Sequence, residues 1–275
     1  SAAGEAINPD KVRYNIYDVA NNGELIAEGV IEIPCVFQGV EAGNQQFVQY
    51  SVSAVTDGGE SDKTSTASIA AGTPYAGFHE SYAGGKASTI FMAERINYGN
   101  WAVQADGEVV SADVDGGLMV MNGYFAGYCG AMTTGKISLA GMQAPALRFY
   151  SYTPDNSGLD LNTLAISVSA NGDEWTEVFN KTVVAMGADQ GWHEVIVPLN
   201  EYTGSNISLR FTATTYDRPY ISTYIDNLNV EDLAGIDLEI TDITAPAHVR
   251  TGEEFIVSVS LANNGSEDAT GFSVE

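Results

Sequence analysis

The chain has 275 residues, and 44% of them are hydrophobic, which suits two or more globular domains. It holds 36 Asp and Glu against 11 Lys and Arg, so its formal net charge is −25. Such a surface repels phosphate backbones and anionic lipid headgroups, which makes nucleic acid and membrane surfaces poor partner candidates and favours cations, Ca²⁺ above all. The alternative is that the acidic side chains only keep the surface soluble.

Strand patterns run through the whole chain, and no window carries the apolar periodicity of an amphipathic helix. Turn sequences such as Asn22-Gly23 and Asn171-Gly172 separate the strands. Short strands at this spacing predict an all-β, multidomain protein built of β-sandwiches. No apolar run approaches the about 20 residues that a membrane-spanning helix needs. The clearest predicted strands, in chain order, are residues 12–17, 47–55, 146–152, 164–168, 193–197, 207–211 and 255–261.

Two junctions divide the chain into three predicted domains. Residues 70–77 offer no side chains for a core and are interpreted as a linker, and residues 231–236 close one strand before another begins. The predicted domains are residues 1–74, 75–232 and 236–275. The first and last hold only part of a sandwich, which would leave a core face and a strand edge exposed. We therefore expect the rest of a longer parent chain, or a neighbouring chain, to complete them.

The two outer segments carry motifs of extracellular modules. The strand sequences Lys11–Tyr17 and Gln46–Val55, with the turn Gly59-Glu60-Ser61 after them, resemble the third and sixth strands of a fibronectin type III domain. The stretch from Asp237 to Gly265 resembles the opening strands of an immunoglobulin-like domain of the CARDB kind. These resemblances imply partial β-sandwiches on either side of the central segment.

The central segment carries four landmarks in order. They are Phe78–Tyr82, Met132–Tyr152, Ser167–Phe179 and Trp192–Val230. In this order and spacing they resemble the cleaved-adhesin and MAM-like modules, also described as choice-of-anchor J domains. The resemblance implies a jelly roll whose opening and closing strands lie side by side.

The same resemblance implies a structural Ca²⁺ ion. In related modules an acidic residue of the opening strand and an Asp of the closing strand bind the ion, and these correspond here to Glu80 and Asp226. The chemistry is suitable, because Ca²⁺ takes six to eight oxygen ligands and carboxylates from both chain ends would hold the sandwich closed. The usual closing Asp pair is Asp226-Asn227 here, so one charged ligand is an amide or absent. The alternative is that both acids are solvated residues at strand ends.

A second acidic stretch is weaker as a metal site. Asp113 and Asp115 precede a glycine, as in the start of a Ca²⁺-binding loop. The full loop pattern demands a bidentate Glu at position 12, where this chain has Tyr124. Asp106, in a similar but shorter sequence, is weaker again. The alternative for all three acids is a solvated hairpin loop.

Catalytic motifs are missing from the sequence. The three histidines, His79, His193 and His248, show no zinc-binding spacing, and no Gly-x-Ser-x-Gly elbow is present. We therefore expect no enzyme active site in these residues.

Exposed aromatic residues on a jelly roll can stack on sugars. The candidate ligand-binding residues are Tyr124 and Tyr128 in one loop and Tyr216 and Tyr220 in another, with ordinary packing as the alternative. Trp175 and Trp192 match landmarks on strands and are interpreted as core residues.

The sequence thus predicts a non-catalytic adhesion or ligand-binding region of a bacterial protein that is secreted or held at the cell surface. Its partner is expected to be an extracellular protein or glycan. An alternative is the carbohydrate- or protein-binding accessory tail of a secreted peptidase or glycoside hydrolase, whose catalytic domain lies outside these residues. A third is a purely structural stalk.

Overall fold

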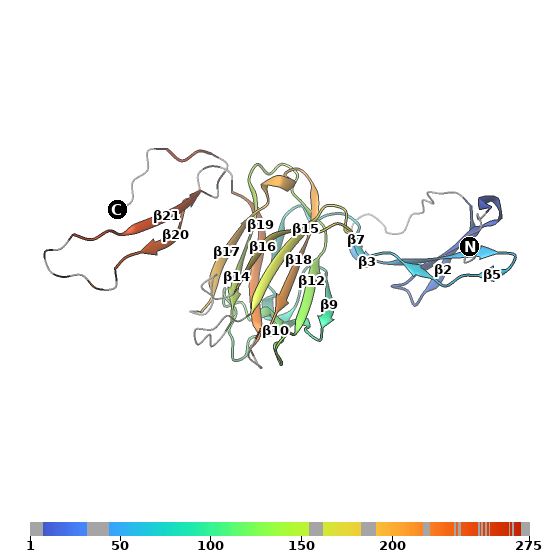
Figure 1. Cartoon of the computed structure of the whole chain (residues 1–275), viewed down its shortest axis with the longest axis horizontal. Helices are drawn as coiled ribbons and strands as arrows, with labels where there is room; N and C mark the ends of the chain where they lie inside the picture. Colours follow the sequence, from blue (N-terminus) through green and yellow to red (C-terminus); the bar gives the residue numbers. More distant parts are fainter. Residues whose placement is uncertain are drawn as a thin grey trace.

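The computed structural model of the chain describes residues 8–31, 44–153, 162–182, 191–216, 221–233, 235, 238–246, 248, 250, 252, 254–263, 265 and 267–270. The protein is all-β, with a two-layer sandwich in the middle and smaller sheets toward either end of the chain (Figure 1). Helical structure in the described residues is limited to short 3-10 turns: η1 (Pro9–Lys11), η2 (Ala83–Gly85) and η5 (Asn200–Tyr202). None of the helices found there is long and apolar enough to cross a membrane.

The first segment forms an antiparallel sheet in the order β2-β1-β4-β5, with β6 also paired to β4. Residues 19–23 join β1 to β2, and Asn22 and Gly23 at the end of this loop have φ angles of 54° and 71°, in the left-handed region that favours Asn and Gly. The strands are β1 (Arg13–Asp18), β2 (Glu24–Val30), β4 (Tyr50–Thr56), β5 (Gly59–Glu60) and β6 (Thr64–Ser65).

The strand predicted at 47–55 is in fact two strands. β3 (Gln46–Val48) pairs with β7 (Ile69–Ala71), whereas β4 pairs with β1, and the chain changes partners at Gln49. The linker predicted at 70–77 is also wrong in part, because Ala70 lies in β7 and Tyr75 forms a parallel bridge with Ile137 of the jelly roll. Small residues at this junction permit close backbone approach rather than flexibility.

The central segment is a jelly-roll sandwich of two six-stranded antiparallel sheets. One sheet has the order β10-β11-β19-β14-β17, with β8 added on β19, and consists of β8 (Phe78–Glu80), β10 (Trp101–Ala105), β11 (Gly117–Met121), β14 (Pro145–Tyr152), β17 (His193–Pro198) and β19 (Thr223–Asp232). The other has the order β16-β15-β18-β12-β9, with β13 added on β18, and consists of β9 (Phe91–Asn97), β12 (Cys129–Thr134), β13 (Ile137–Ser138), β15 (Thr163–Ser169), β16 (Thr176–Thr182) and β18 (Asn206–Thr214). The opening strand β8 and the closing strand β19 lie side by side, as the resemblance implies.

The hydrophobic core lies between these two sheets. Phe149 of β14 and Phe211 of β18 are fully buried and meet edge to face across the sandwich, with ring centroids 5.7 Å apart. Alternate residues of the inner strands point inward because successive side chains of a strand face opposite ways. The core therefore joins strands that are far apart in the sequence.

The last segment forms a two-stranded hairpin of β20 (Leu238–Thr244) and β21 (Ser258–Asn263). The strand predicted to start at Phe255 begins at Ser258. Every residue of β20 is exposed. The domain boundaries and the identities of the two outer segments stay predictions.

Candidate functional site

Glu80 ends β8 and is one of two acidic side chains buried where the opening and closing strands meet. It is 2% exposed. Its Oε1 accepts a hydrogen bond from the backbone N–H of Tyr82 at 3.0 Å. Its Oε2 accepts four more, from the backbone N–H and the hydroxyl of both Ser88 and Thr89, at 2.6–3.1 Å. The carboxylate of Glu80 is thus well supplied with donors, which offsets the cost of burying its charge.

Asp226, on β19, has a poorer environment although it is fully buried. Its Oδ2 accepts the backbone N–H of Ala112 and its Oδ1 that of Asn227, each at 2.7 Å. The pKa of Asp226 is raised to about 7, chiefly by burial and to a lesser extent by the charges of Asp113 and Asp115, while the two hydrogen bonds lower it. At neutral pH this carboxyl therefore needs a proton or a cation.

The hydroxyl of Tyr82 lies within the electrostatic reach of both carboxylates. Tyr82 is 2% exposed, and its pKa is raised by burial first and then by the charges of Glu80 and Asp226. Among the described residues, no Lys or Arg forms an ion pair with either carboxylate. Glu80 and Asp226 thus lie on the paired strands β8 and β19, and their joint role as metal ligands stays a prediction.

The second acidic stretch lies beside the first, although it is distant in sequence. The hydrogen bond from Ala112 to Asp226 joins residues 114 positions apart. It anchors the loop that carries Asp113 and Asp115 next to Asp226. Asp106, at the start of this loop, accepts hydrogen bonds from the backbone N–H and the hydroxyl of Ser111. Sequence spacing treats these acids as a separate site, whereas the fold places Asp113 and Asp115 in the electrostatic surroundings of Asp226.

The donor chemistry of this region suits Ca²⁺. All candidate ligand atoms are hard oxygens, and Asp226 keeps unshared lone pairs because each of its oxygens accepts one hydrogen bond. The described part of the chain contains no group of three or more His, Cys, Asp or Glu side chains arranged to hold a metal ion. Two carboxylates are too few for the six to eight oxygen ligands of Ca²⁺, so an ion here would also need backbone carbonyls and water.

The predicted ligand-binding tyrosines lie in loops that link the strands. Tyr124 is 54% exposed and Tyr216 58%, whereas Tyr128 is half-buried. Tyr220 lies outside the described residues. The ring of Tyr128 contacts Phe125 at 5.5 Å and Tyr98 at 5.8 Å between centroids.

Sequence analysis missed Tyr98. It is the most exposed of these aromatic residues, at 77%, and sits in the turn between β9 and β10 with a φ of 59°. A parallel bridge to Cys129 brings this turn against the loop of Tyr128. We call Tyr98, Phe125 and Tyr128 the aromatic surface. The feature that marks Tyr98 is its positive φ, which is uncommon for a bulky residue. This angle is known only from the structure, so the sequence could not reveal it.

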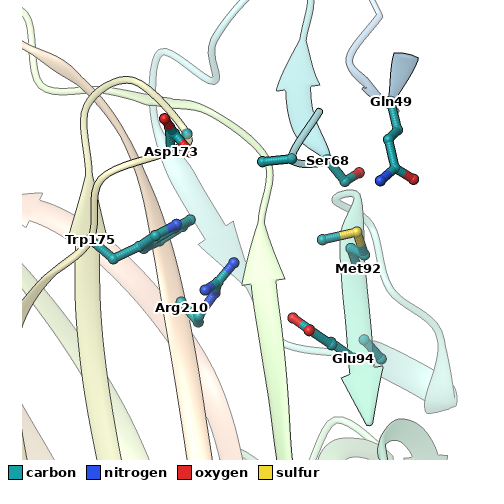
Figure 2. A pocket seen from close by; sticks show the side chains of 10 residues that line it. Gln49, Ser68, Met92, Glu94, Asp173, Trp175 and Arg210 are labelled. Carbon is teal, nitrogen blue, oxygen red and sulfur yellow. The ribbon is translucent and has the colours of Figure 1, made fainter. Parts of the chain in front are cut away.

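Trp192 packs as predicted, but Trp175 does not lie in the core. Trp192 is half-buried, contacts Tyr152 at 5.6 Å between ring centroids, and donates from Nε1 to the carbonyl of Val110 at 2.7 Å. Trp175 instead lines a surface pocket of about 460 Å³, where the guanidinium of Arg210 stacks 4.1 Å from the centre of its ring (Figure 2). Sequence analysis had no signal for this pocket, because its walls come from separate segments.

Comparison with known proteins gives structural similarities only. No family model and no curated protein matches the chain. The chain is similar to the K1 cleaved adhesin domain of Lys-gingipain from Porphyromonas gingivalis W83, at 12% identity over 57% of this chain and 98% of that domain, with a TM-score of 0.44. It is also similar to the C-terminal family 22 carbohydrate-binding module of Clostridium thermocellum Xyn10B, at 12% identity over 56% of this chain and 91% of that module, with a TM-score of 0.38. Identities this low leave the function of the chain to its own residues.

Proposed function

We propose that the chain is a non-catalytic adhesion region of a bacterial secreted or cell-surface protein, and that it binds an extracellular glycan or protein. The observation that carries this proposal is the aromatic surface of Tyr98, Phe125 and Tyr128. Clustered aromatic rings left in water are unfavourable unless a partner covers them, and such patches mark interaction sites. Tyrosine rings bind well because they combine a large apolar face with a polar tip and have few rotatable bonds.

Hydrogen bonds hold the loops of this surface in place. Thr215 donates from its hydroxyl to the carbonyl of Phe125, at 2.6 Å, and accepts the backbone N–H of Tyr128 at 2.9 Å. Gly127 donates its N–H to the carbonyl of Thr215 at 2.8 Å. A surface fixed in this way loses little conformational entropy when it binds, which favours affinity.

We further propose that Ca²⁺ binds at Glu80 and Asp226 and holds β8 against β19. The chemistry that the ion supplies is charge neutralisation of two buried carboxylates. Support comes from the burial of both side chains and from the pKa of Asp226, which burial raises to about 7. The chain's own part is to hold Glu80 with five hydrogen bonds, so that one ligand is already oriented.

We propose the parent architecture from motifs. The first segment is proposed as a fibronectin type III-like sandwich, the central one as a cleaved-adhesin or MAM-like module, and the last as the start of a CARDB-type domain. The order of landmarks in the central segment is the main support, since it extends over the whole jelly roll.

The binding proposal can be tested with the full chain on glycan arrays and on a panel of extracellular matrix proteins. We expect binding to at least one ligand, weakened at least tenfold in Kd by Tyr98→Ala and by Phe125→Ala. Phe255→Ala is the matched control, since Phe255 is 55% exposed but lies near the terminal hairpin. Binding that is insensitive to both substitutions would overturn the aromatic surface as the binding site, and no binding to any ligand would favour the stalk alternative.

A further inference from the structure

We propose that the first segment and the jelly roll together form a second site, which binds a neutral saccharide in the pocket beside Trp175. The proposal rests on the binding function proposed above, but not on the aromatic surface. The pocket is lined on one side by Trp175 and Arg210 and on the other by Met92 and Glu94 (Figure 2). Its remaining walls come from the β15–β16 turn and from the first segment, through Asp173, Gln49 and Ser68.

Specific contacts hold the first segment against the jelly roll, so that it can form one wall of the pocket. Gln45 clamps Lys136 of the jelly roll with two hydrogen bonds, donating to its carbonyl at 2.9 Å and accepting its N–H at 2.6 Å. Ile69 packs closely on the β15–β16 turn. A Cβ at Gly172 would lie 2.6 Å from Cγ2 of Ile69, which is too close for a side chain. The φ of Gly172 is +82°, so both the backbone and the close approach favour glycine here. The two segments therefore meet in a defined geometry.

The break between β3 and β4 at Gln49 positions the pocket wall that the first segment contributes. The chain leaves β3 and enters β4 at this residue, and the side chain of Gln49 donates to the carbonyl of Thr66 at 2.9 Å. This hydrogen bond joins the break between β3 and β4 to residues 66–68, which include Ser68. A continuous strand at 47–55 would have paired differently and left no such wall.

Arg210 is the main binding group of the pocket. Its Nε donates to the hydroxyl of Thr133 at 3.2 Å, and its Cζ lies over the ring of Trp175, 4.1 Å from the ring centre. Within the described residues its two Nη groups form no hydrogen bond and no ion pair, although Glu94 lies across the pocket. A guanidinium that is fixed in place with free donors can form two parallel hydrogen bonds to neighbouring ligand oxygens.

The remaining lining groups match a saccharide. Glu94 and Asp173 offer acceptors, Gln49 and Ser68 offer both donors and acceptors, and each sugar hydroxyl needs one of each. Trp175 and Met92 supply apolar surface for the C–H face of a sugar ring. The volume of about 460 Å³ lies in the range of about 300–1,000 Å³ that is usual for small-ligand pockets.

The charge of the pocket selects an uncharged saccharide. Two carboxylates against one guanidinium leave the pocket negative, and the whole chain carries a formal charge of −25. Uronates and sulfated glycans would meet repulsion both inside the pocket and at long range. Neutral hexoses and pentoses do not have this penalty.

The test is a binding titration of the full chain with neutral di- and trisaccharides of glucose, xylose, galactose and mannose, and with oligogalacturonate. Arg210→Lys keeps the charge but removes the planar fork, and Arg95→Lys is its control because Arg95 lies on the same edge of the sandwich outside the pocket lining. Ser68→Trp fills the pocket from the first segment, and Ser65→Trp on exposed β6 is its control. Thermal melting checks that each variant folds.

We expect a neutral saccharide to bind, with Kd raised at least tenfold by Arg210→Lys and by Ser68→Trp but unchanged by either control. Tyr98→Ala should leave this binding intact, which separates the pocket from the aromatic surface. Binding of oligogalacturonate alone would overturn the ligand class. Wild-type binding by Ser68→Trp would overturn the shared site, and no binding to any saccharide would overturn the proposal as a whole.

Discussion

The jelly roll and the terminal hairpin β20–β21 use similar sequences to different effect. β15 and β20 are both seven residues long, both contain several β-branched residues, and both pair antiparallel with a neighbouring strand. In β15, Leu164, Ile166 and Val168 are buried, whereas Ile240 and Ile243 of β20 are 52% and 60% exposed. Sequence alternation thus predicts a strand, but burial requires a second layer to pack against.

The same contrast applies to charged groups. The jelly roll buries Glu80 and Asp226, while Glu239 and Asp242 of the hairpin stay exposed in water. The exposed carboxylates of the hairpin stay in contact with water, so the stability of the fold depends little on them. Acids in the jelly roll depend on the donors, protons or cations that the fold supplies.

The largest expected effect is in the core. Phe211→Ala removes a fully buried ring that meets Phe149 across the sandwich. We expect the free energy of unfolding to fall by about 3–5 kcal/mol, because a cavity is left where the ring was. Urea titration followed by tryptophan fluorescence measures it. A loss below about 1 kcal/mol would mean that the two sheets are not packed as described.

Calcium is expected to have the next largest effect. A saturating ion that binds only the folded state would stabilise it by about 2.7 kcal/mol at a concentration 100 times Kd. The effect should depend on pH through Asp226. Its ordinary pKa is 3.8 and its folded pKa is about 7, so without metal the folded state holds an extra proton between these values. Stability in EDTA should therefore fall as pH rises through 7.

If Ca²⁺ replaces that proton, as proposed, its stabilisation should be larger at pH 8 than at pH 5. Thermal melting with Ca²⁺ or EDTA at both pH values measures it. Asp226→Asn should abolish the response to Ca²⁺ and remove the fall in stability with pH in EDTA. An equal melting temperature with and without Ca²⁺ at pH 8 would rule out the ion.

A smaller effect is expected at Glu80. Glu80→Gln replaces an acceptor oxygen by an NH₂ group, which cannot accept the donors of Ser88 and Thr89. Leaving buried donors unpaired should cost about 1–3 kcal/mol, measured by urea unfolding in EDTA. Glu254→Gln, at an exposed position, is the control and should change little. Equal stability of Glu80→Gln and wild type would show that the hydrogen bonds of the buried Glu80 carboxylate contribute little to folding.

The smallest effect is expected on the hairpin. Ile240→Ser removes an apolar side chain that is 52% exposed, so the free energy of unfolding of the jelly roll should change by less than about 0.5 kcal/mol. Urea unfolding followed by the jelly-roll tryptophans checks it. A loss comparable to that of Phe211→Ala would mean that the hairpin and the jelly roll share a packed surface.

Much of the fold could be predicted because its signals are local. Strand alternation at 146–152 and 207–211 corresponds to β14 and β18, and Asn22-Gly23 lies in the turn between β1 and β2, as expected. The resemblance to cleaved-adhesin modules implied that the strands of Glu80 and Asp226 lie side by side, and β8 does pair with β19. The split of the strand at Gln49 could not be predicted, because residues 46–56 are β-favouring throughout and only the partner strands differ.

The sequence by itself determined the all-β character, the position of most strands and the strongly acidic surface, because propensity, alternation and charge act over a few residues. Tertiary structure alone decided which side chains meet. It placed Asp113 and Asp115 beside Asp226, joined Tyr98 to Tyr128, and moved Trp175 from an expected core position into a pocket with Arg210. These contacts depend on strand register and on the docking of separate segments, which no short stretch of sequence encodes.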